Sequence, residues 1–336
     1  MNTPVILERA RSLVEPAMEA AVDGLCGELR GPSRYHLGWA GVDGSPSAPG
    51  AGKGLRPALA VLSAEAAGAP DAVAVPGAVA VELVHNFSLV HDDMIDGDTE
   101  RRHRATVWAA FGTDDAIITG DALHNLAFQV LLVDLTPERV AATARLARAT
   151  SAMLAGQAAD MAFDDTLDVG LDDCLAMEAD KTGALLGCAA SIGAVLAGAD
   201  PAVVEALDSY GRELGLAFQA VDDVLGIWGD PAVTGKAAGN DLRERKKSMP
   251  VAIVLTGEPG AAAELAAVYR QHGDLSDDDV ARATRIIEAA GGRERTLDEA
   301  GDRLGAALAA IDGVGLVPSA CDELRGLARF VVDRRF

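Results

Sequence analysis

Aromatic residues are scarce in this chain, where seven Phe, three Trp and three Tyr amount to 4% of 336 residues. Runs of Val and Ile bounded by hairpin turns are also missing, whereas Ala and Leu dominate and 49% of the residues are hydrophobic. These features argue against a sheet protein and supply enough apolar material for a large helical core. The chain contains no Ser/Pro-rich linker and no fixed-period repeat. We therefore predict an all-α fold formed by a single domain, residues 1–336.

Cysteines are few and show no ligand pattern. The chain has four, without CxxC or Cys/His spacing: Cys26, Cys174, Cys188 and Cys321. This usage excludes a disulfide framework and is typical of small core residues in a reducing compartment. Charged residues precede any long apolar run at the N-terminus, and no uncharged stretch reaches the length of a membrane span. We expect a cytoplasmic protein without a membrane span.

Basic residues are also few compared with acidic residues. The 29 basic and 51 acidic residues give a net charge of −22, which argues against nucleic acid or an anionic membrane as a general partner. Residues 229–250 are an exception, because this glycine-punctuated segment is basic. We interpret it as a lid loop that closes over a polyanionic ligand, with an ordinary solvated loop as the alternative.

Helical periodicity covers most of the sequence. An amphipathic helix is predicted over residues 3–30, and a Gly/Pro/Ser-rich loop over residues 31–55. Within that loop, YHLGW (35–39) is either a docking or lid element or a plain connection. Further helices are predicted near residues 57–67, 72–95, 105–111, 114–133, 137–160, 172–197, 201–227, 248–256, 259–271, 276–290, 294–312 and 318–334.

Two aspartate clusters interrupt apolar helical stretches. The first comprises Asp92, Asp93 and Asp96, and the second comprises Asp222 and Asp223. Carboxylates are costly to desolvate unless a cation compensates them. Asp92 and Asp96 lie one helical turn apart, so both can approach the same ions. Together the clusters predict sites for Mg²⁺, with phosphate oxygens as further ligands.

Several basic residues lie near these clusters in the sequence. They are Lys53, Arg56, Arg101, Arg102, Lys181, Lys236 and Lys246. Any one of them could be an ordinary surface charge. As a set they favour a polyanionic ligand such as a diphosphate.

Four segments carry a family resemblance: GKGLRP (52–57), HNFSLVHDDMIDGDTERR (85–102), DKTG (180–183) and FQAVDDVLGIWGDPAVTGK (218–236). In this order they resemble the trans-prenyltransferases, the polyprenyl (geranylgeranyl-type) diphosphate synthases. The resemblance covers about residues 50–250. It implies the isoprenoid synthase type I fold, a helical bundle with a central cavity, and a homodimer. The implied reaction is a Mg²⁺-dependent head-to-tail (1′-4) condensation of isopentenyl diphosphate with an allylic diphosphate.

The resemblance also assigns roles to individual residues. Three Mg²⁺ ions that clamp the allylic diphosphate would be bound by Asp92, Asp96 and Asp222. That diphosphate would be contacted by Arg101, Lys181, Lys236 and Lys246. Isopentenyl diphosphate would be bound by Lys53, Arg56, His85 and Arg102. Gln219 and Asp223 would take supporting polar positions, and Asp93 and Asp223 are counted with the residues of the metal sites. Thr182 would lie beside the nascent carbocation, and the released diphosphate would accept the final proton.

The second aspartate motif departs from the family pattern, because Gly226 stands where an aspartate is usual. Asp230 is a candidate replacement for the missing carboxylate. The expected product is geranylgeranyl diphosphate, with Phe87 as the floor of the chain pocket and with Ser88 and Val84 as its neighbours. The alternative for Phe87 is plain core packing.

Two other functions are compatible with parts of the sequence. A class I terpene cyclase shares the implied fold and the first aspartate motif, but it has no need of an isopentenyl diphosphate site. A non-catalytic or cargo subunit of a larger assembly typically loses the aspartates that this chain keeps. Whether turnover requires isopentenyl diphosphate separates the first alternative from a synthase.

Overall fold

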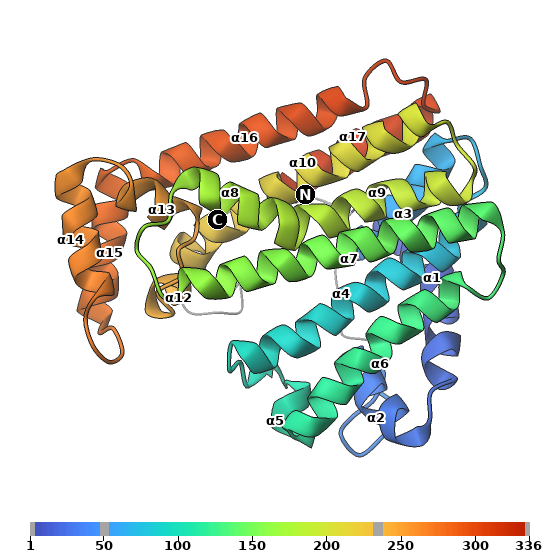
Figure 1. The fold of residues 1–336 in the computed structure, drawn as a ribbon, viewed down its shortest axis with the longest axis horizontal. Helices are drawn as coiled ribbons and strands as arrows, with labels where there is room; N and C mark the ends of the chain where they lie inside the picture. Colours follow the sequence, from blue (N-terminus) through green and yellow to red (C-terminus); the bar gives the residue numbers. More distant parts are fainter. Residues whose placement is uncertain (1–3, 48–53, 231–237, 333–336) are drawn as a thin grey trace. The chain divides into compact units, whose positions relative to one another are not determined.

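The computed structural model describes residues 4–47, 54–230 and 238–332, and these residues are almost entirely helical (Figure 1). The all-α prediction is therefore confirmed. The first helical elements are α1 (Val5–Asp23), α2 (Gly27–His36), α3 (Leu55–Ala66), the 3₁₀ turn η1 (Asp71–Ala74), α4 (Val75–Ile95), α5 (Val107–Phe111) and α6 (Thr113–Leu131). They are followed by α7 (Pro137–Phe163), α8 (Leu171–Glu178), the π-helical turn η2 (Ala179–Gly183), α9 (Ala184–Leu196) and α10 (Pro201–Trp228). The last are α12 (Asn240–Arg243), α13 (Met249–Leu255), α14 (Pro259–Tyr269), α15 (Asp277–Ala289), α16 (Gly292–Ala310) and α17 (Pro318–Val332).

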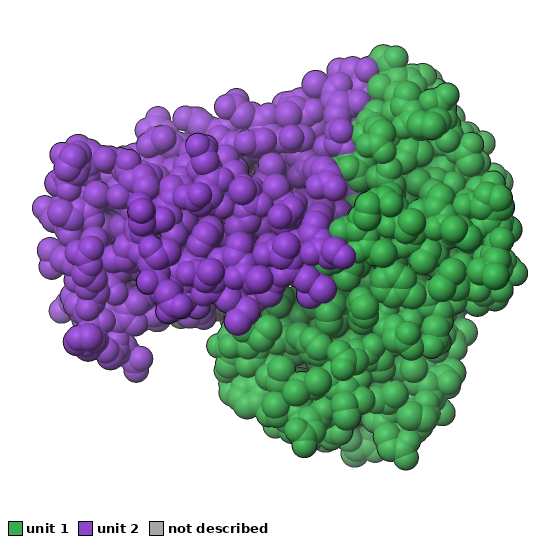
Figure 2. Space-filling view, in the orientation of Figure 1, with its two compact units in different colours: residues 1–150, 188–208, 313–324 green, residues 151–187, 209–312, 325–336 purple. Residues whose placement is uncertain are grey.

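The chain divides into two compact units, which Figure 2 shows in different colours. Unit 1 contains residues 1–150, 188–208 and 313–324, and unit 2 contains residues 151–187, 209–312 and 325–336. The division falls within α7, α9, α10 and α17, so neither unit is one continuous stretch of chain. That the chain forms a single domain stays a prediction.

In unit 1 the main buried helix is α4, which packs against α3 and α6. Its residues Ala78–Val81 are buried on every side, as expected of a helix that is apolar all round. By length and composition one helix in the described residues, spanning residues 71–95, could cross a membrane. The finding is weak evidence for a span, because 61% of its most apolar window is buried inside the protein, as in an ordinary core helix.

In unit 2 two apolar clusters hold the C-terminal part of α10 against the helices that follow it. One cluster joins Ile227 of α10 to Leu242 of α12 and to buried residues of α13, α14 and α15. The other joins Ala220 and Val221 of α10 to Met249 and Ile253 of α13. These contacts fix the positions of the second aspartate motif and of α12.

The N-terminal predictions need correction. The helix predicted over residues 3–30 is interrupted between Asp23 and Gly27, and α2 then continues to His36 inside the predicted loop, residues 31–55. Pro32 lies inside α2, where its missing N–H removes one backbone hydrogen bond without ending the helix. Burial of Tyr35, which is 6% exposed, favours the helix, so tertiary packing overrides the loop-like composition.

Two other segments also differ from the sequence predictions. The segment predicted as a basic lid loop, residues 229–250, contains α12 and the first residues of α13, because Leu242 and Met249 are fully buried. Strands β1 (Glu100–Arg101) and β2 (Arg104–Ala105) form a short antiparallel hairpin that was not predicted. Residues 231–237 of the predicted lid lie outside the described residues.

Candidate active site

The first aspartate cluster lies at the C-terminal end of α4 in unit 1. Asp92 is half-buried, Asp96 is exposed, and Asp93 between them is buried with 1% of its surface exposed. The three residues therefore have different surroundings although they belong to one motif. Asp92 and Asp96 keep access to solvent, which a metal ligand needs, whereas Asp93 faces the protein.

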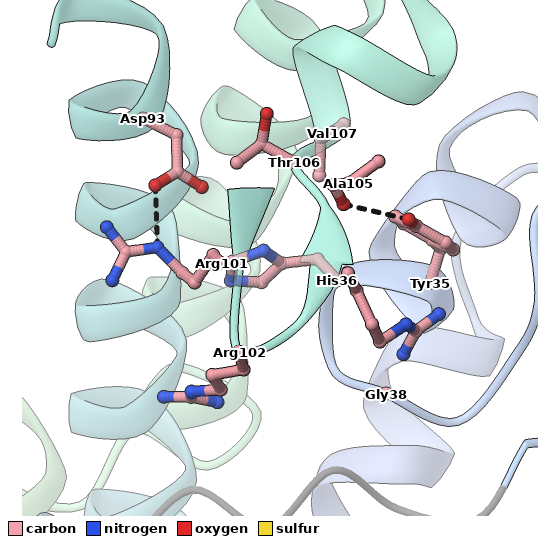
Figure 3. A pocket seen from close by; sticks show the side chains of 10 residues that line it. Tyr35, His36, Gly38, Asp93, Arg101, Arg102, Ala105, Thr106 and Val107 are labelled. Atoms are coloured by element: carbon pink, nitrogen blue, oxygen red, sulfur yellow. Dashed lines mark hydrogen bonds and ion pairs between the residues drawn. The ribbon is translucent and has the colours of Figure 1, made fainter. Parts of the chain in front are cut away.

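Asp93 anchors the hairpin that carries the two predicted arginines (Figure 3). Nε of Arg101 donates to Oδ1 of Asp93 at 2.6 Å, an ion pair that ties β1 to α4. Burial raises the pKa of Asp93, and the charge of Arg101 acts in the opposite direction. The other oxygen, Oδ2, is buried and has no hydrogen-bond partner among the described residues. The metal-ligand role of Asp93 stays a prediction, and the structure shows that this residue positions Arg101.

The turn of this hairpin has an uncommon backbone. Arg102 and His103 connect β1 to β2, and both have positive φ values, 53° and 61°. A two-residue hairpin turn of this kind strongly favours Asn-Gly or Asp-Gly, so a β-carbon at each position adds strain. Strained backbone of this kind concentrates at functional sites, which agrees with the predicted role of Arg102.

Helix α2 and the YHLGW segment brace the same hairpin. The hydroxyl of Tyr35 donates to the carbonyl of Ala105 at 2.8 Å (Figure 3). The guanidinium of Arg104 lies 4.3 Å from the centre of the Tyr35 ring. Arg104 also donates to the carbonyl of Ala40 at 2.7 Å. Nε2 of His36 donates to Oδ1 of Asn86 on α4 at 3.1 Å, since the amide nitrogen of Asn86 donates to Glu82. The segment therefore supports the arginine hairpin, and whether it also serves as a docking or lid element stays a prediction.

The surroundings of His36 predict that the stability of the fold depends on pH. Burial, followed by the charges of Arg102 and Arg101, lowers the pKa of His36 to about 3, and Arg104 contributes in the same direction. In the unfolded chain a histidine binds a proton near pH 6.5. Between about pH 6.5 and pH 3 the unfolded state thus binds more protons at this histidine than the folded state does. The free energy of unfolding therefore falls as the pH is lowered.

We expect His36→Gln to weaken this pH dependence of the free energy of unfolding, measured by urea unfolding across that range. An unchanged pH slope would contradict the buried neutral histidine, and His272→Gln, at an exposed histidine, is the control.

Three of the residues predicted to bind isopentenyl diphosphate lie close to one another in unit 1. Burial and then the charges of Arg56 and Arg102 lower the pKa of His85 well below its usual value, so the imidazole is neutral. Burial also lowers the pKa of Arg56, and Glu82 opposes this change. Nε of Arg56 is buried without a hydrogen-bond acceptor among the described residues, a situation that an anionic ligand would relieve. Lys53 lies outside the described residues.

The second aspartate motif lies on α10 in unit 2. Asp222 is exposed, whereas Asp223 is buried and accepts hydrogen bonds at both oxygens. Nε2 of Gln219 donates to Oδ1 at 2.9 Å, and the backbone nitrogen of Met249 donates to Oδ2 at 2.8 Å. Thr182 donates to Oε1 of Gln219 at 3.3 Å, so Thr182, Gln219 and Asp223 form one chain of hydrogen bonds. The predicted supporting role of Gln219 agrees with these contacts.

Lys181 and Thr182 lie in the π-helical turn η2 that joins α8 to α9. Nζ of Lys181 donates to Oδ2 of Asp160 on α7 at 2.5 Å. One turn before Asp160, a Cβ at Gly156 would lie 2.3 Å from the backbone nitrogen of Lys181. Glycine at this position therefore allows α7 to approach the backbone of the turn. Single π-helical turns inside longer helices occur frequently at functional sites.

Three predicted site residues of the C-terminal half remain to be placed: Lys246, Asp230 and Lys236. Lys246 is half-buried, and its ammonium lies 3.3 Å from Oε2 of Glu244. Asp230 is exposed just after the end of α10. Lys236 lies outside the described residues.

Three acidic residues lie beside predicted site residues but were not themselves predicted from the sequence. Glu82 lies one turn before His85 and Asn86, and Glu178 lies beside Asp223, where burial and then the Asp223 charge raise the pKa of Glu178 well above its usual value. Glu82 is a lone carboxylate in an apolar helical stretch, a signal that the sequence contained, whereas Glu178 lies between Asp173 and Asp180 and stood out less. The third, Asp241, lies against Gly226 and gave no such signal, because a basic segment surrounds it.

Phe87, one of the predicted chain-length residues, belongs to an aromatic cluster between α4 and α6 of unit 1. The Phe87 ring lies 5.0 Å from the His91 ring and 4.9 Å from the His124 ring. His124 in turn contacts Phe128, with ring centres 5.1 Å apart. Val84 is fully buried, and the hydroxyl of Ser88 donates to the carbonyl of His85 at 2.9 Å. Phe87 is thus held by packing, which suits either a rigid floor or a core position.

The exposed and half-buried aspartates are compatible with magnesium. Asp92, Asp96 and Asp222 offer carboxylate oxygens, the donors that this hard cation prefers, and each keeps some exposed surface. Asp223 is less suitable as a direct ligand, because both of its oxygens already accept hydrogen bonds.

Comparisons with known proteins identify the family. The polyprenyl synthetase family model matches residues 47–287. The (2E,6E)-farnesyl diphosphate synthase of Mycobacterium tuberculosis is 45% identical over 337 residues, which cover 99% of this chain and 94% of that protein. The geranylgeranyl diphosphate synthase of the same organism is 45% identical over 308 residues, covering 91% of this chain and 88% of that one.

Solved structures show the same fold. A polyprenyl synthetase from Streptomyces coelicolor superposes with a TM-score of 0.94 at 48% identity, covering 98% of this chain and 100% of that one. A geranylgeranyl pyrophosphate synthase from Corynebacterium glutamicum, complexed with isoprenyl diphosphate and magnesium, has a TM-score of 0.83 at 27% identity, with 100% of both chains covered. The chain therefore belongs to the polyprenyl synthetase family of prenyltransferases.

Proposed function

We propose that the protein condenses isopentenyl diphosphate with an allylic diphosphate, head to tail (1′-4), and that its product is all-trans geranylgeranyl diphosphate. The observation that carries this proposal is the Arg101–Asp93 ion pair, which holds two arginines next to the aspartates of α4. Carboxylates beside guanidinium groups suit a diphosphate bound together with magnesium. We further infer three Mg²⁺ ions, a homodimer and a cytoplasmic location.

In this reaction Asp92, Asp96 and Asp222 would hold magnesium. The bound ions would supply compensation for the negative charge that develops on the leaving diphosphate. Cationic side chains contact the same diphosphate, namely Arg101, Lys181, Lys236 and Lys246. Charges that are already in place before the C–O bond breaks need no reorganisation as the carbocation forms, and this is the source of their catalytic effect.

A second set of side chains binds isopentenyl diphosphate, namely Lys53, Arg56, His85 and Arg102. His85 enters as a neutral imidazole and donates a hydrogen bond without adding charge. The double bond of isopentenyl diphosphate attacks the allylic cation, a C–C bond forms, and the released diphosphate takes the proton that leaves. Thr182, held by Gln219, lies beside the cation.

The test is product analysis with labelled isopentenyl diphosphate and each allylic starter in the presence of Mg²⁺. Geranylgeranyl diphosphate as the end product supports the proposal. Farnesyl diphosphate as the end product would contradict the assigned chain length but not the condensation. No incorporation with any starter, or turnover of an allylic diphosphate alone, would contradict the synthase function.

Phe87→Ala is expected to lengthen the product beyond geranylgeranyl diphosphate, because the missing ring opens the floor of the chain pocket. Phe128→Ala is the matched control, since it removes a ring from the same aromatic cluster without opening the proposed floor. Chromatography of the dephosphorylated products measures both. If Phe87→Ala and the wild type give the same product while both proteins remain folded, Phe87 is a packing residue only.

A further inference from the structure

The carboxylate of Asp241 occupies the space that a side chain at position 226 would need. A Cβ added to Gly226 would lie 2.0 Å from Oδ2 of Asp241, 2.4 Å from Cγ and 2.7 Å from Oδ1. These three atoms are the nearest to that Cβ, and both residues belong to unit 2. Gly226 is the position where the second aspartate motif lacks its usual carboxylate. A carboxylate is thus present at this point of α10, but it comes from another segment of the chain.

The backbone around Asp241 is fixed on both sides. The nitrogen of Gly239 donates to the carbonyl of Ile227 at 3.1 Å, which ties the segment to the end of α10. Gly239 has a φ of 72°, a conformation that favours glycine. On the other side Leu242 is fully buried in the apolar cluster that includes Ile227. The position of Asp241 against Gly226 therefore follows from the packing of α12 against α10.

The charges of Asp222 and Asp223, in the second aspartate motif, act on Asp241. Burial raises the pKa of Asp241 to about 7, Lys246 lowers it, and the charges of Asp223 and Asp222 raise it further. Neighbouring carboxylates in a half-buried position repel one another, and a divalent cation removes this repulsion. A further positive charge near Asp241 would act on this carboxylate in the same direction as Lys246 does.

We propose that Asp241 replaces the carboxylate missing at Gly226 and acts as a positioning residue of the magnesium site at Asp222. This inference rests on the proposed function. Asp230, the replacement predicted from the sequence, is exposed beyond the end of α10. The atoms nearest to a Cβ at Gly226 all belong to Asp241.

The experiment measures Mg²⁺ affinity by isothermal titration calorimetry in the presence of inorganic diphosphate. Asp241→Asn keeps the size and shape of the side chain and removes its charge, so a merely structural role would leave the affinity unchanged. We expect a loss of about tenfold, the lower end of the cost of removing residues that orient metal ligands. Asp302→Asn is the matched control, because it makes the same chemical change at an exposed residue of α16 in the same unit.

A swap variant tests the position of the carboxylate. Gly226→Asp combined with Asp241→Gly returns a carboxylate to α10, and we expect it to recover most of the lost Mg²⁺ affinity. Asp241→Gly alone should not recover it. Gly226→Asp alone should lower the melting temperature, since its Cβ would overlap Asp241. Circular dichroism establishes that each variant used for titration is folded.

Three results would overturn the inference. They are wild-type Mg²⁺ affinity in Asp241→Asn, a folded swap variant with no recovery, and loss of affinity in Asp230→Asn but not in Asp241→Asn. A wild-type protein that neither binds Mg²⁺ with diphosphate nor condenses its substrates would instead contradict the proposed function. The two failures are therefore distinguishable.

Discussion

Asp92→Asn is expected to lower kcat by about a thousand-fold, the upper end of the cost of removing one group that stabilises developing negative charge. Asparagine has nearly the shape of aspartate, but its neutral oxygen binds Mg²⁺ weakly. The charge on the leaving diphosphate would then lose part of its compensation as the C–O bond breaks. Incorporation of labelled isopentenyl diphosphate at increasing Mg²⁺ concentration measures the effect.

The control for this experiment is Asp121→Asn, which makes the same chemical change on an exposed face of α6. It should leave kcat unchanged. Because Asp92 is only half-buried, the melting temperature of Asp92→Asn should stay close to that of the wild type. Full kcat at saturating Mg²⁺ in folded Asp92→Asn would show that this carboxylate is dispensable for the reaction.

Gly193→Ala is expected to lower the free energy of unfolding by about 3 kcal/mol, the upper end of the usual cost of overpacking. A Cβ at this position of α9 would lie 2.1 Å from the carbonyl oxygen of Ala60 and 2.8 Å from the backbone nitrogen of Ala64. Backbone atoms of α3 cannot turn aside as a flexible side chain can. The hydrogen bond from the Gly193 nitrogen to the hydroxyl of Ser63, 3.0 Å long, would be disturbed as well.

Gly305→Ala on α16 is the matched control, because no atom lies within 4 Å of the added Cβ. There alanine should stabilise the helix by about 0.5–1 kcal/mol, since glycine carries an entropic penalty in a helix interior. Urea unfolding followed by circular dichroism compares the two variants. Equal shifts in the two unfolding curves would mean that α3 and α9 separate to admit the methyl group at little cost.

The helices could be predicted from the sequence because their boundaries are local. Proline begins α7 and α10 at Pro137 and Pro201, and the apolar pattern runs on to within a few residues of the observed ends. The helix predicted near 172–197 is also helical in the structure, but it contains the π-helical turn η2. That turn depends on the approach of α7 at Gly156, a tertiary contact that periodicity does not reveal.

The candidate site could be predicted as a set of residues but not as a set of contacts. Arg102 and His103 form a hairpin turn without the usual glycine, so no turn signal marked the hairpin. Asp92 and Asp93 have different surroundings because consecutive residues of α4 lie about 100° apart around the helix, and Asp93 faces Arg101 of the hairpin. Asp241 was missed because its neighbour Gly226 lies in a different helix and because a glycine gives no sign of what fills the space beside it.

The π-helical turn makes the length of this stretch of chain as important as its composition. Such a turn contains one residue more than the α-helical turn that it replaces. Loss of a single residue within this turn would let α8 and α9 join as one regular α-helix and would change the backbone at Lys181 and Thr182. Their contacts with Asp160 and Gln219 would then be disturbed, although both residues would still be present in the sequence. A deletion in η2 would therefore alter the proposed site without removing any of its side chains.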